Sequence, residues 1–413
     1  MTDLIKPFAA LRPRAEYASQ VVAPPYDVVD TEEARALAAD RPFSFLHISR
    51  PEIDLPPGTD PASDAAYAKG KANLDELIER GVLVRDSSPA LYIYRMTMGA
   101  HRQTGVALTA SVHAYEEDRV RKHELTRPDK ERDRVRNIDT LNAQTGPVLT
   151  AYRSDPHIRE LIARAAAAEP LFEVVGPNGV LHTVWTVSDA PALGDLTSAL
   201  NSLDALYIAD GHHRSAAASR VAAERRRRDP AAGAQAPFEY FLAVAFPEDE
   251  LAIYDYNRVV ADLNGLDTEQ FLKRIETAFA IEPLNEACKP KAPREVSMYV
   301  GHRWYRLRIH EALWSEDPVD GLDVSLLQRH LIEPVLGIAE PRTDKRIDFV
   351  GGIRGLGALE QRVDSGRGAV AFALYPTSMA ELMAVADARR LMPPKSTWFE
   401  PKLADGLLSH VLD

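Results

Sequence analysis

Five consecutive residues have the types that phosphate, carboxylate or metal chemistry needs: Asp210, Gly211, His212, His213 and Arg214. They follow a short apolar run and precede an alanine-rich segment, residues 215–224, which predicts a helix. The cluster is therefore expected at a strand-to-helix turn, where backbone amides at the helix start favour an anion. Gly211 would let the chain turn tightly. Arg214 could hold a phosphate or carboxylate through two parallel donors, and Asp210 could hold a cation or accept a proton.

The same residues also have a purely structural explanation, in which Asp210 caps the helix and the histidines pack locally. Capping needs one polar side chain, whereas this cluster has four of complementary type within five positions. We therefore favour a ligand site at this turn.

A second polar segment, residues 121–134, is so highly charged that a solvated helix face is its usual interpretation. Its first part differs, because Lys122, His123, Glu124 and Thr126 precede Pro128 and should lie in a loop before the helix. A histidine, a carboxylate, a hydroxyl and several cations in one loop could contact a phosphorylated substrate. Solvation and a site both stay open for this loop.

Composition limits the classes of protein that the chain could represent. Its 413 residues are too many for one simple core. A net charge of −12 argues against binding to nucleic acid or to an anionic membrane that is driven by the net charge of the protein. One cysteine, Cys288, excludes an intrachain disulfide and a cysteine-rich zinc site. No signal-peptide pattern and no run of about 18 apolar residues is found, so we expect a cytoplasmic protein without a membrane span. Homo-oligomerisation stays open.

The elements that must position these residues indicate a mixed α/β fold. Strands are expected over residues 90–96 and 101–115, and residues 105–112 should form an interior strand because they are apolar on both faces. Asn178-Gly179 predicts a hairpin turn, and residues 193–203 predict a helix that leads into the cluster.

Beyond residue 262 strands and helices alternate, which suggests an α/β layer. Residues 324–336, for example, predict one helix. We therefore predict a core of residues 1–262 with mixed sheets that contains the Asp210 site. A C-terminal α/β region of residues 263–413 would follow, with a tail that could fold back on the core.

That tail contains the rigid, cationic run Met392-Pro393-Pro394-Lys395-Ser396-Thr397-Trp398-Phe399. Lys-Ser-Thr suggests a phosphate loop, but the glycines that should precede the lysine are replaced by prolines, and we reject that interpretation. The run could cover a site as a lid or anchor, or simply dock the C-terminus. We favour docking.

Four motifs together resemble a known family, the bacterial and archaeal domain-of-unknown-function family 1015. They are Pro24-Pro25-Tyr26-Asp27-Val28, Lys122-His123-Glu124-Leu125-Thr126, Ile208-Ala209-Asp210-Gly211-His212-His213-Arg214 and the run that begins at Met392. The motifs occur in order over nearly the whole chain. One segment departs from the family, since residues 254–258 differ from its usual Pro-Thr-His-Arg. The resemblance implies no settled activity.

The box Asp210–Arg214 also resembles the Asp-Gly-His-x-Arg box of free-serine kinases built on the ParB/sulfiredoxin fold. This resemblance implies a ParB/sulfiredoxin-like phosphate-binding core. It further implies that residues 211–214 hold nucleotide phosphates and that Asp210 takes a metal or the substrate hydroxyl. Those kinases use a glutamate from a separate segment as base, and Glu124 is the candidate here by its chemistry. The predicted catalytic residues are Asp210, Glu124 and His123, and the predicted nucleotide-binding residues are Gly211, His212, His213, Arg214, Lys122 and Lys395.

The leading hypothesis is phosphoryl transfer from ATP or ADP, with Mg²⁺ at Asp210, to the hydroxyl of a small metabolite, and free L-serine is the best guess. A metal-dependent hydrolase is the second, with His123, Asp210, His212 and His213 as Zn²⁺ or Mn²⁺ ligands. It ranks lower because adjacent histidine side chains diverge. A non-catalytic nucleotide-binding module is the third. The expected partners are a nucleotide and a small-molecule substrate, without nucleic acid or membrane.

Overall fold

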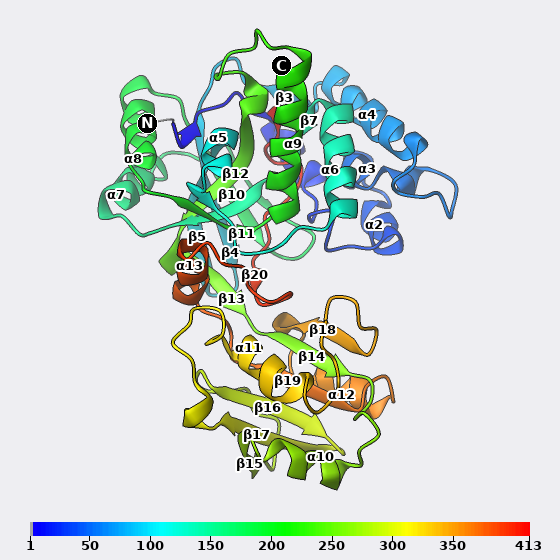
Figure 1. Ribbon diagram of the computed structural model, residues 1–413. Helices are drawn as coiled ribbons and strands as arrows, with labels where there is room; N and C mark the ends of the chain where they lie inside the picture. The colour runs from blue at the N-terminus through cyan, green and yellow to red at the C-terminus, as the bar shows by residue number, and fades with distance from the viewer. Residues whose placement is uncertain (1–2) are drawn as a thin grey trace. The chain divides into compact units, whose positions relative to one another are not determined.

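The computed structural model describes residues 3–413, which form two structural units (Figure 1). The first unit comprises the chain up to Lys122, then Thr126–Leu251 and Pro401–Asp413. The second comprises His123–Leu125 and Ala252–Glu400. Both described ends of the chain therefore belong to the first unit, which also contains residues 210–214.

A nine-stranded sheet forms the centre of the first unit. Its strands are β1 (Ile5–Lys6), β4 (Leu91–Met98), β5 (His101–Ser111), β6 (Val120–Arg121), β8 (Val148–Tyr152), β9 (Phe172–Val175), β10 (Leu181–Val187), β11 (Leu206–Asp210) and β12 (Tyr240–Pro247). The order is β6-β11-β8-β12-β5-β4-β10-β9, and β1 pairs with β5. The β6–β11 and β8–β12 pairs are parallel and the other pairs antiparallel, so the sheet is mixed.

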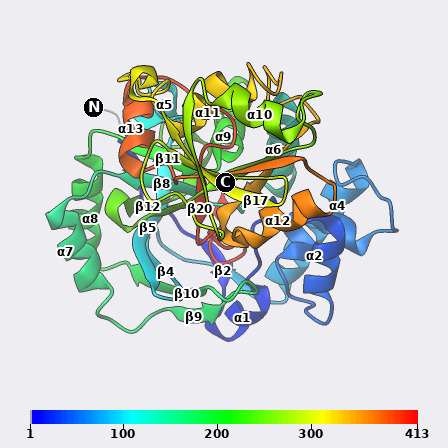
Figure 2. The same ribbon diagram turned by 90° about the horizontal axis from the view of Figure 1, so that it is seen from below.

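Helices and two short ladders complete this unit. The helices are α1 (Ala18–Val21), α2 (Thr31–Ala38), α3 (Leu46–Ser49), α4 (Asp64–Glu79), α5 (Val112–Glu116), α6 (Pro128–Leu141), α7 (Pro156–Ala165), α8 (Ala190–Asn201) and α9 (His212–Arg228). The ladders are β2 (Leu11–Pro13) with β3 (Leu83–Arg85), and β7 (Ala143–Gln144) with β21 (His410–Val411). In Figure 2, α7 and α8 lie side by side at one flank of this unit, and α2 and α4 lie at another.

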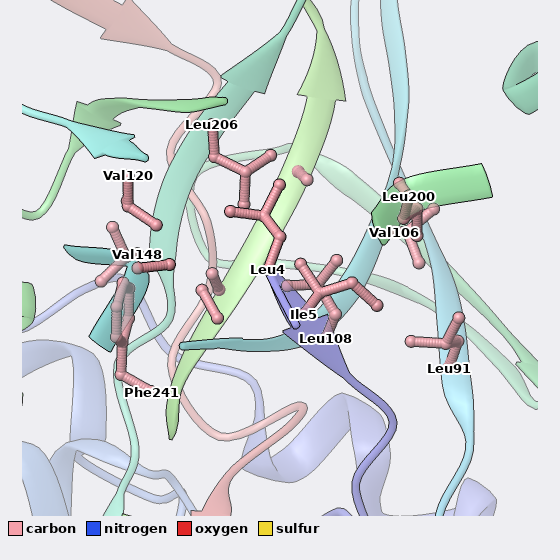
Figure 3. Packing of buried hydrophobic residues seen from close by; sticks show 14 of the residues in the cluster. Leu4, Ile5, Leu91, Val106, Leu108, Val120, Val148, Leu200, Leu206 and Phe241 are labelled. Carbon is pink, nitrogen blue, oxygen red and sulfur yellow. The ribbon is translucent and has the colours of Figure 1, made fainter. Parts of the chain in front are cut away.

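The main hydrophobic core lies between the sheet and helices α6–α9. Figure 3 shows Ile5 of β1, and Leu4 just before that strand, among the side chains of Val106, Leu108 and Leu200. Apolar residues of α9 that recur at helical spacing, such as Ala217, Ala218 and Val221, enter the same core. Burial of this stripe holds α9 against the sheet, and thereby fixes the position of its first turn beside the end of β11.

The second unit contains a six-stranded antiparallel sheet of order β15-β17-β16-β19-β14-β18. Its strands are β14 (Tyr256–Val260), β15 (Phe279–Pro283), β16 (Glu295–Val300), β17 (Arg303–Ile309), β18 (Ile347–Gly351) and β19 (Val370–Leu374). Its helices are α10 (Thr268–Ile275), α11 (Asp323–Leu327), α12 (Gly357–Asp364) and α13 (Met379–Asp387). A further ladder joins β13 (Ala252–Tyr254) and β20 (Trp398–Glu400).

The predicted mixed α/β fold with mixed sheets is confirmed. The hairpin at Asn178-Gly179 joins β9 to β10, with Gly179 at φ +78°, and β5 is a buried interior strand between β12 and β4. Other expectations differ in detail. Residues 324–336 do not form one regular helix, because α11 ends at Leu327 and a π-helical turn, Gln328–Ile332, follows. The strands and helices that alternate after residue 262 form an antiparallel sheet, so this alternation does not reflect parallel strands joined by crossover helices.

Candidate functional site

The polar cluster lies at the turn between β11 and α9. The register of β11 against β8 shifts between Ile208 and Asp210, and such an irregularity changes where the following side chain points. Gly211 precedes the helix with φ +99°, which a residue with a side chain rarely adopts. The helix begins at His212, three residues before the predicted start at Ser215. The two histidines and Arg214 therefore form its first turn.

Capping does not explain Asp210. The residue before the helix is Gly211, which has no side chain that could cap the amides at the start of α9, so Asp210 is not at the capping position. Instead the backbone amides of Arg214 and Ser215 donate to the carbonyl of Gly211 at 2.9 and 3.1 Å. The amides that precede them have no carbonyl within the helix to bond, as at any helix start.

Arg214 binds both the strand end and a neighbouring loop. Its Nη2 donates to Oδ2 of Asp210 at 3.1 Å, and its Nη1 donates to the carbonyl of Pro147 at 2.8 Å. The Arg214 side chain is 9% exposed, whereas that of Asp210 is 33% exposed. Burial alone would lower the pKa of Arg214, but Asp27 and Asp210 raise it above its ordinary value. The guanidinium therefore stays charged, and the carboxylate beside it is accessible from outside.

Lys402, near the end of the chain, is a second cation beside Asp210. Its Nζ lies 3.6 Å from Oδ2 of Asp210, the same oxygen that Arg214 contacts. Burial raises the pKa of Asp210, but Lys402 and Arg214 outweigh it and hold that pKa below its ordinary value. Asp210 is therefore an ionised carboxylate between two cations, and its charge is already compensated within the first unit.

The tail that carries Lys402 is fixed by backbone hydrogen bonds. Asp405 exchanges two of them with Ala23, at 3.0 and 3.2 Å, and Ser409 exchanges two with Leu11, both at 2.9 Å. The ladder of β21 with β7 follows. Leu407, Leu408 and Leu412 are at most 3% exposed, so this end of the chain is part of the core of the first unit.

The two histidines of the box have different surroundings. His212 is 5% exposed, and its carbonyl accepts a hydrogen bond from Ser215 Oγ at 3.0 Å. Nε2 of His213 accepts a hydrogen bond from the backbone amide of Arg127 at 3.0 Å, and burial lowers the pKa of His213. An accepting Nε2 leaves the proton of the neutral ring on Nδ1. Nε2 of His213 is therefore engaged and not available to a metal ion.

A cavity of about 30 Å³ lies beside Arg214 within the first unit. Gly146, Arg134 and Asp405 are among the residues that line it. Asp405 is 1% exposed; burial raises its pKa to about 7, with Arg214 opposing the rise and Asp27 adding to it.

Tyr26 also lines this cavity, and its backbone amide donates to Oδ2 of Asp405 at 3.2 Å. The guanidinium of Arg134 lies 3.8 Å from the centre of the Tyr26 ring. Asp27 is exposed, on the Pro-Pro turn that its sequence predicted. Asp27, Asp210 and Asp405 are thus all close enough to Arg214 to raise its pKa.

The other sequence-predicted residues are Lys122 of the first unit, and His123, Glu124 and Lys395 of the second unit. Nζ of Lys122 is 3.4 Å from Asp118 Oδ1 and 4.3 Å from the centre of the Tyr115 ring. His123 and Glu124 are assigned to the second unit, where the His123 carbonyl accepts a hydrogen bond from the Met392 amide at 2.8 Å.

Lys395 also belongs to the second unit. Its carbonyl accepts a hydrogen bond from Arg258 at 3.1 Å, and its Nζ lies 5.6 Å from the centre of the Tyr256 ring. The structure therefore groups Asp210, Gly211, His212, His213 and Arg214 in the first unit, and it assigns His123, Glu124 and Lys395 to the second.

Sequence reasoning did not select Lys402, Asp405, Arg134 or Gly146 as site residues. A Cβ at Gly146 would lie 3.3 Å from Asp405 Oδ1 and 3.4 Å from Arg214 Cδ, so this glycine lets the tail and the helix approach each other. The sequence offers only weak signals for these residues, an Asp-Gly pair at 405–406 and a Gly-Pro pair at 146–147.

The fold and the turn first define the class, a mixed α/β protein with charged side chains gathered where a strand enters a helix. The sequence matches the model of the family described as protein of unknown function, DUF1015, over residues 5–325, and the chain belongs to that family. The predicted resemblance is confirmed over this range, and the run that begins at Met392 lies beyond it. Comparison with curated proteins gives no match.

Among solved structures, the chain is similar to free serine kinase in complex with AMP, at 13% identity over 71% of this chain and 86% of that chain, with a TM-score of 0.35. It is similar to SbnI with a C-terminal truncation from Staphylococcus aureus, at 11% identity over 72% and 85%, with a TM-score of 0.39. A conserved hypothetical protein from Pyrococcus furiosus is 14% identical over 73% and 93%, with a TM-score of 0.35.

Among residues 3–413, none of the helices has both the length and the apolar character that crossing a membrane requires.

Proposed function

We propose that the protein is a phosphotransferase that moves a phosphoryl group from ATP or ADP to the hydroxyl of a small metabolite, with free L-serine as the first acceptor to test. The observation that carries the proposal is the first turn of α9. There a glycine with positive φ, the amides of a helix start and the guanidinium of Arg214 occur together. These groups favour a phosphate.

A metal ion at Asp210 would share this carboxylate with two cations. Both Lys402 and Arg214 contact Oδ2 of Asp210, so a metal would be held through the other carboxylate oxygen. One carboxylate together with phosphate oxygens is the donor set that Mg²⁺ usually takes in such sites. Bound there, Mg²⁺ would neutralise charge on the phosphate oxygens. A phosphate close to Asp210 would also gain from Lys402.

Glu124 is the proposed base that removes the proton from the acceptor hydroxyl, with His123 beside it. The chain itself limits how far Glu124 lies from the turn. Glu124 is three residues before Arg127, so the Cα atoms of these two residues are at most about 11 Å apart. The backbone amide of Arg127 in turn donates a hydrogen bond to His213 in the first turn of α9. Lys122 and Lys395 stay predictions as further nucleotide contacts.

The first test is isothermal titration of the full chain with ATP, ADP and AMP, with and without Mg²⁺. We expect ATP or ADP to bind, and to bind more tightly with Mg²⁺. Incubation with L-serine should then give a phosphomonoester signal in ³¹P NMR. Absence of nucleotide binding at millimolar concentration contradicts the proposal.

Two substitutions separate binding from chemistry. Arg214→Gln should weaken nucleotide binding at least tenfold, because it removes the guanidinium at the helix start. Glu124→Gln should leave nucleotide binding within about twofold and lower the transfer rate at least 100-fold, the usual contribution of a general base. Glu117→Gln, at the exposed end of α5, is the matched control and should change neither quantity. A fully active Glu124→Gln variant would exclude Glu124 as the base.

A further inference from the structure

The C-terminal tail and the first turn of α9 place a carboxyl and a guanidinium against the same glycine. A Cβ at Gly146 would lie 3.3 Å from Asp405 Oδ1 and 3.6 Å from Arg214 Nη1. Oδ1 of Asp405 and Nε of Arg214 belong to residues that line the cavity beside Arg214, and neither atom has a hydrogen-bond partner among the described residues. The two side chains are therefore close neighbours in a buried place, without a direct hydrogen bond between these two atoms.

Both guanidiniums at this cavity already have a carboxylate partner. Nη2 of Arg214 donates to Asp210 at 3.1 Å, and Nη2 of Arg134 lies 2.6 Å from Oδ2 of Asp133. Asp405 differs, because the hydrogen bond that its carboxyl accepts, at 3.2 Å, comes from a neutral backbone amide. The cations near Asp405 thus act on it through space, and a proton on this buried carboxyl removes the cost of an ion that lacks a close partner.

The cavity itself connects Asp405 to Arg214. Its volume of about 30 Å³ has room for about two waters, enough to bridge Asp405 Oδ1 to Arg214 Nε. Oγ of Ser49, also buried and without a partner among the described residues, is a further contact for such a bridge. With so little solvent around them, the charges of Asp405 and Arg214 interact more strongly than they would in bulk water.

Asp405 is the group at this cavity that changes charge near neutral pH. Burial, the largest effect, raises its pKa to about 7, and Asp27 adds to the rise, whereas Arg214 and Arg134 oppose it. The titratable and charged groups that face this carboxyl are Tyr26 and Asp27 of the Pro-Pro turn, Tyr94 of β4, Arg134 of α6 and Arg214 of α9. Burial raises the pKa of both tyrosines, and both guanidiniums stay charged, so the change of charge falls on Asp405.

We propose that Asp405 is a positioning residue that controls, through Arg214, how tightly the first turn of α9 holds an anion. While Asp405 keeps its proton, the charge of Arg214 is available to a phosphate at that turn. When Asp405 ionises, its proton goes to the solvent, and the carboxylate competes with the phosphate for the same guanidinium. Anion binding and proton uptake therefore favour each other. The inference rests on the proposed function, which identifies this anion as a nucleotide phosphate.

The test is calorimetric titration of the full chain with ADP and Mg²⁺, for the natural chain and for Asp405→Asn, which keeps the shape of the side chain and cannot ionise. From about pH 6 to about pH 8, the affinity of the natural chain should fall about threefold to tenfold relative to that of the variant. Protonation of ADP itself contributes equally to both chains. Titration of the natural chain in buffers of different ionisation enthalpy should show uptake of about half a proton for each ADP near about pH 7.5.

A matched variant and a measurement without any variant keep the test decisive. Asp249→Asn, at an exposed residue that pairs with Arg159, is the control and should keep the pH dependence of the natural chain. The same pH dependence in the natural chain and in Asp405→Asn overturns the proposal. Absence of net proton uptake by the natural chain also overturns it, and this result decides even where Asp405→Asn does not fold.

Titration with sulfate separates this inference from the proposed function, because sulfate is a phosphate-sized anion that does not titrate near neutral pH. If sulfate binds with proton uptake that Asp405→Asn abolishes, and ADP does not bind, the coupling of Asp405 to Arg214 stands and the kinase proposal fails. If ADP binds with a pH dependence that Asp405→Asn leaves unchanged, phosphoryl transfer stands and the inference fails. Binding of neither anion at about 10 mM contradicts both.

Discussion

Lys402 Nζ and Asp210 Oδ2 lie 3.6 Å apart, which joins the last residues of the chain to the end of the strand that precedes α9. The contact is made inside the first unit, where Asp405 and Ser409 hold the tail by paired backbone hydrogen bonds. The tail is therefore part of the candidate site and more than a peripheral anchor. It supplies one cation to the turn and one carboxylate to the neighbouring cavity.

Lys402→Met should destabilise the first unit by about 1–3 kcal/mol, between the values for exposed and buried ion pairs, because Asp210 keeps only Arg214 as a partner. The pKa of Asp210 should rise, and nucleotide affinity should fall. Urea denaturation followed by far-UV circular dichroism measures the stability. Arg85→Ala removes an exposed pair between β3 and Asp413 at the same tail, and should cost at most about 1 kcal/mol. Equal losses in the two variants would show that Lys402 acts only in docking.

Gly211→Ala should weaken both stability and nucleotide binding. A side chain at φ +99° costs about 1–2 kcal/mol, and the new Cβ would lie 2.9 Å from Arg214 Nε and displace the guanidinium. Gly179→Ala is a matched control, since Gly179 has φ +78° with open space around it and should show the conformational cost alone. Calorimetric titration with ADP should distinguish the two variants. Normal affinity in Gly211→Ala would mean that the position of Arg214 does not matter for binding.

We expect the contribution of Asp405 to the free energy of unfolding to decrease as the pH rises from about 4 to 7. Its folded pKa of about 7 is above the ordinary value of about 3.9, so the unfolded chain releases this proton first. The stabilisation is complete below about pH 4 and is lost as pH rises through 7, by at most about 4 kcal/mol. Burial is the main cause of this raised pKa; Asp27 adds to the rise, and Arg214, the Tyr26 amide and Arg134 oppose it.

Other buried groups have the opposite effect, so the comparison must be made with a variant. Burial lowers the pKa of His182 and that of His410 to about 4. Because both imidazoles are neutral in the folded protein, the free energy of unfolding decreases as the pH falls from about 6.5 to 4. The difference in unfolding free energy between the natural chain and Asp405→Asn isolates Asp405. It should change steadily from pH 4.5 to 7.5, and a difference that does not vary with pH would mean that Asp405 is ionised throughout.

Gly352→Ala should destabilise the second unit by about 1–3 kcal/mol through overpacking, because the added Cβ would overlap the carboxylate of Asp255 and lie 2.6 Å from its carbonyl oxygen. Gly357→Ala, at the start of α12 with open space around it, should cost nothing. Trp304, Trp314 and Trp398 belong to this unit, so urea denaturation followed by tryptophan fluorescence reports mainly on it. An unchanged transition in Gly352→Ala would contradict the close approach of Gly352 to Asp255.

Local patterns predicted the parts of the fold that depend on neighbouring residues. The Asn178-Gly179 hairpin, the interior strand β5 and the strand–turn–helix at Asp210 follow from turn chemistry and from hydrophobic spacing. The predicted start of α9, Ser215, is three residues after the observed start, His212. The prediction relied on apolar residues at helical spacing, and residues 212–214 are all polar. Here burial of α9 against the sheet decides the conformation, and propensity has little weight.

The sequence by itself determined that a charged turn with a glycine hinge precedes a helix, since the residues at 210–214 and the apolar run before them are sufficient for that. Only the tertiary structure decided which distant groups reach the turn. Lys402 and Asp405 arrive there because the tail pairs with β7 and with Ala23 and Leu11, and this pairing depends on the whole sheet. Periodicity along a chain carries information about faces of an element, whereas contacts between ends of the chain depend on topology.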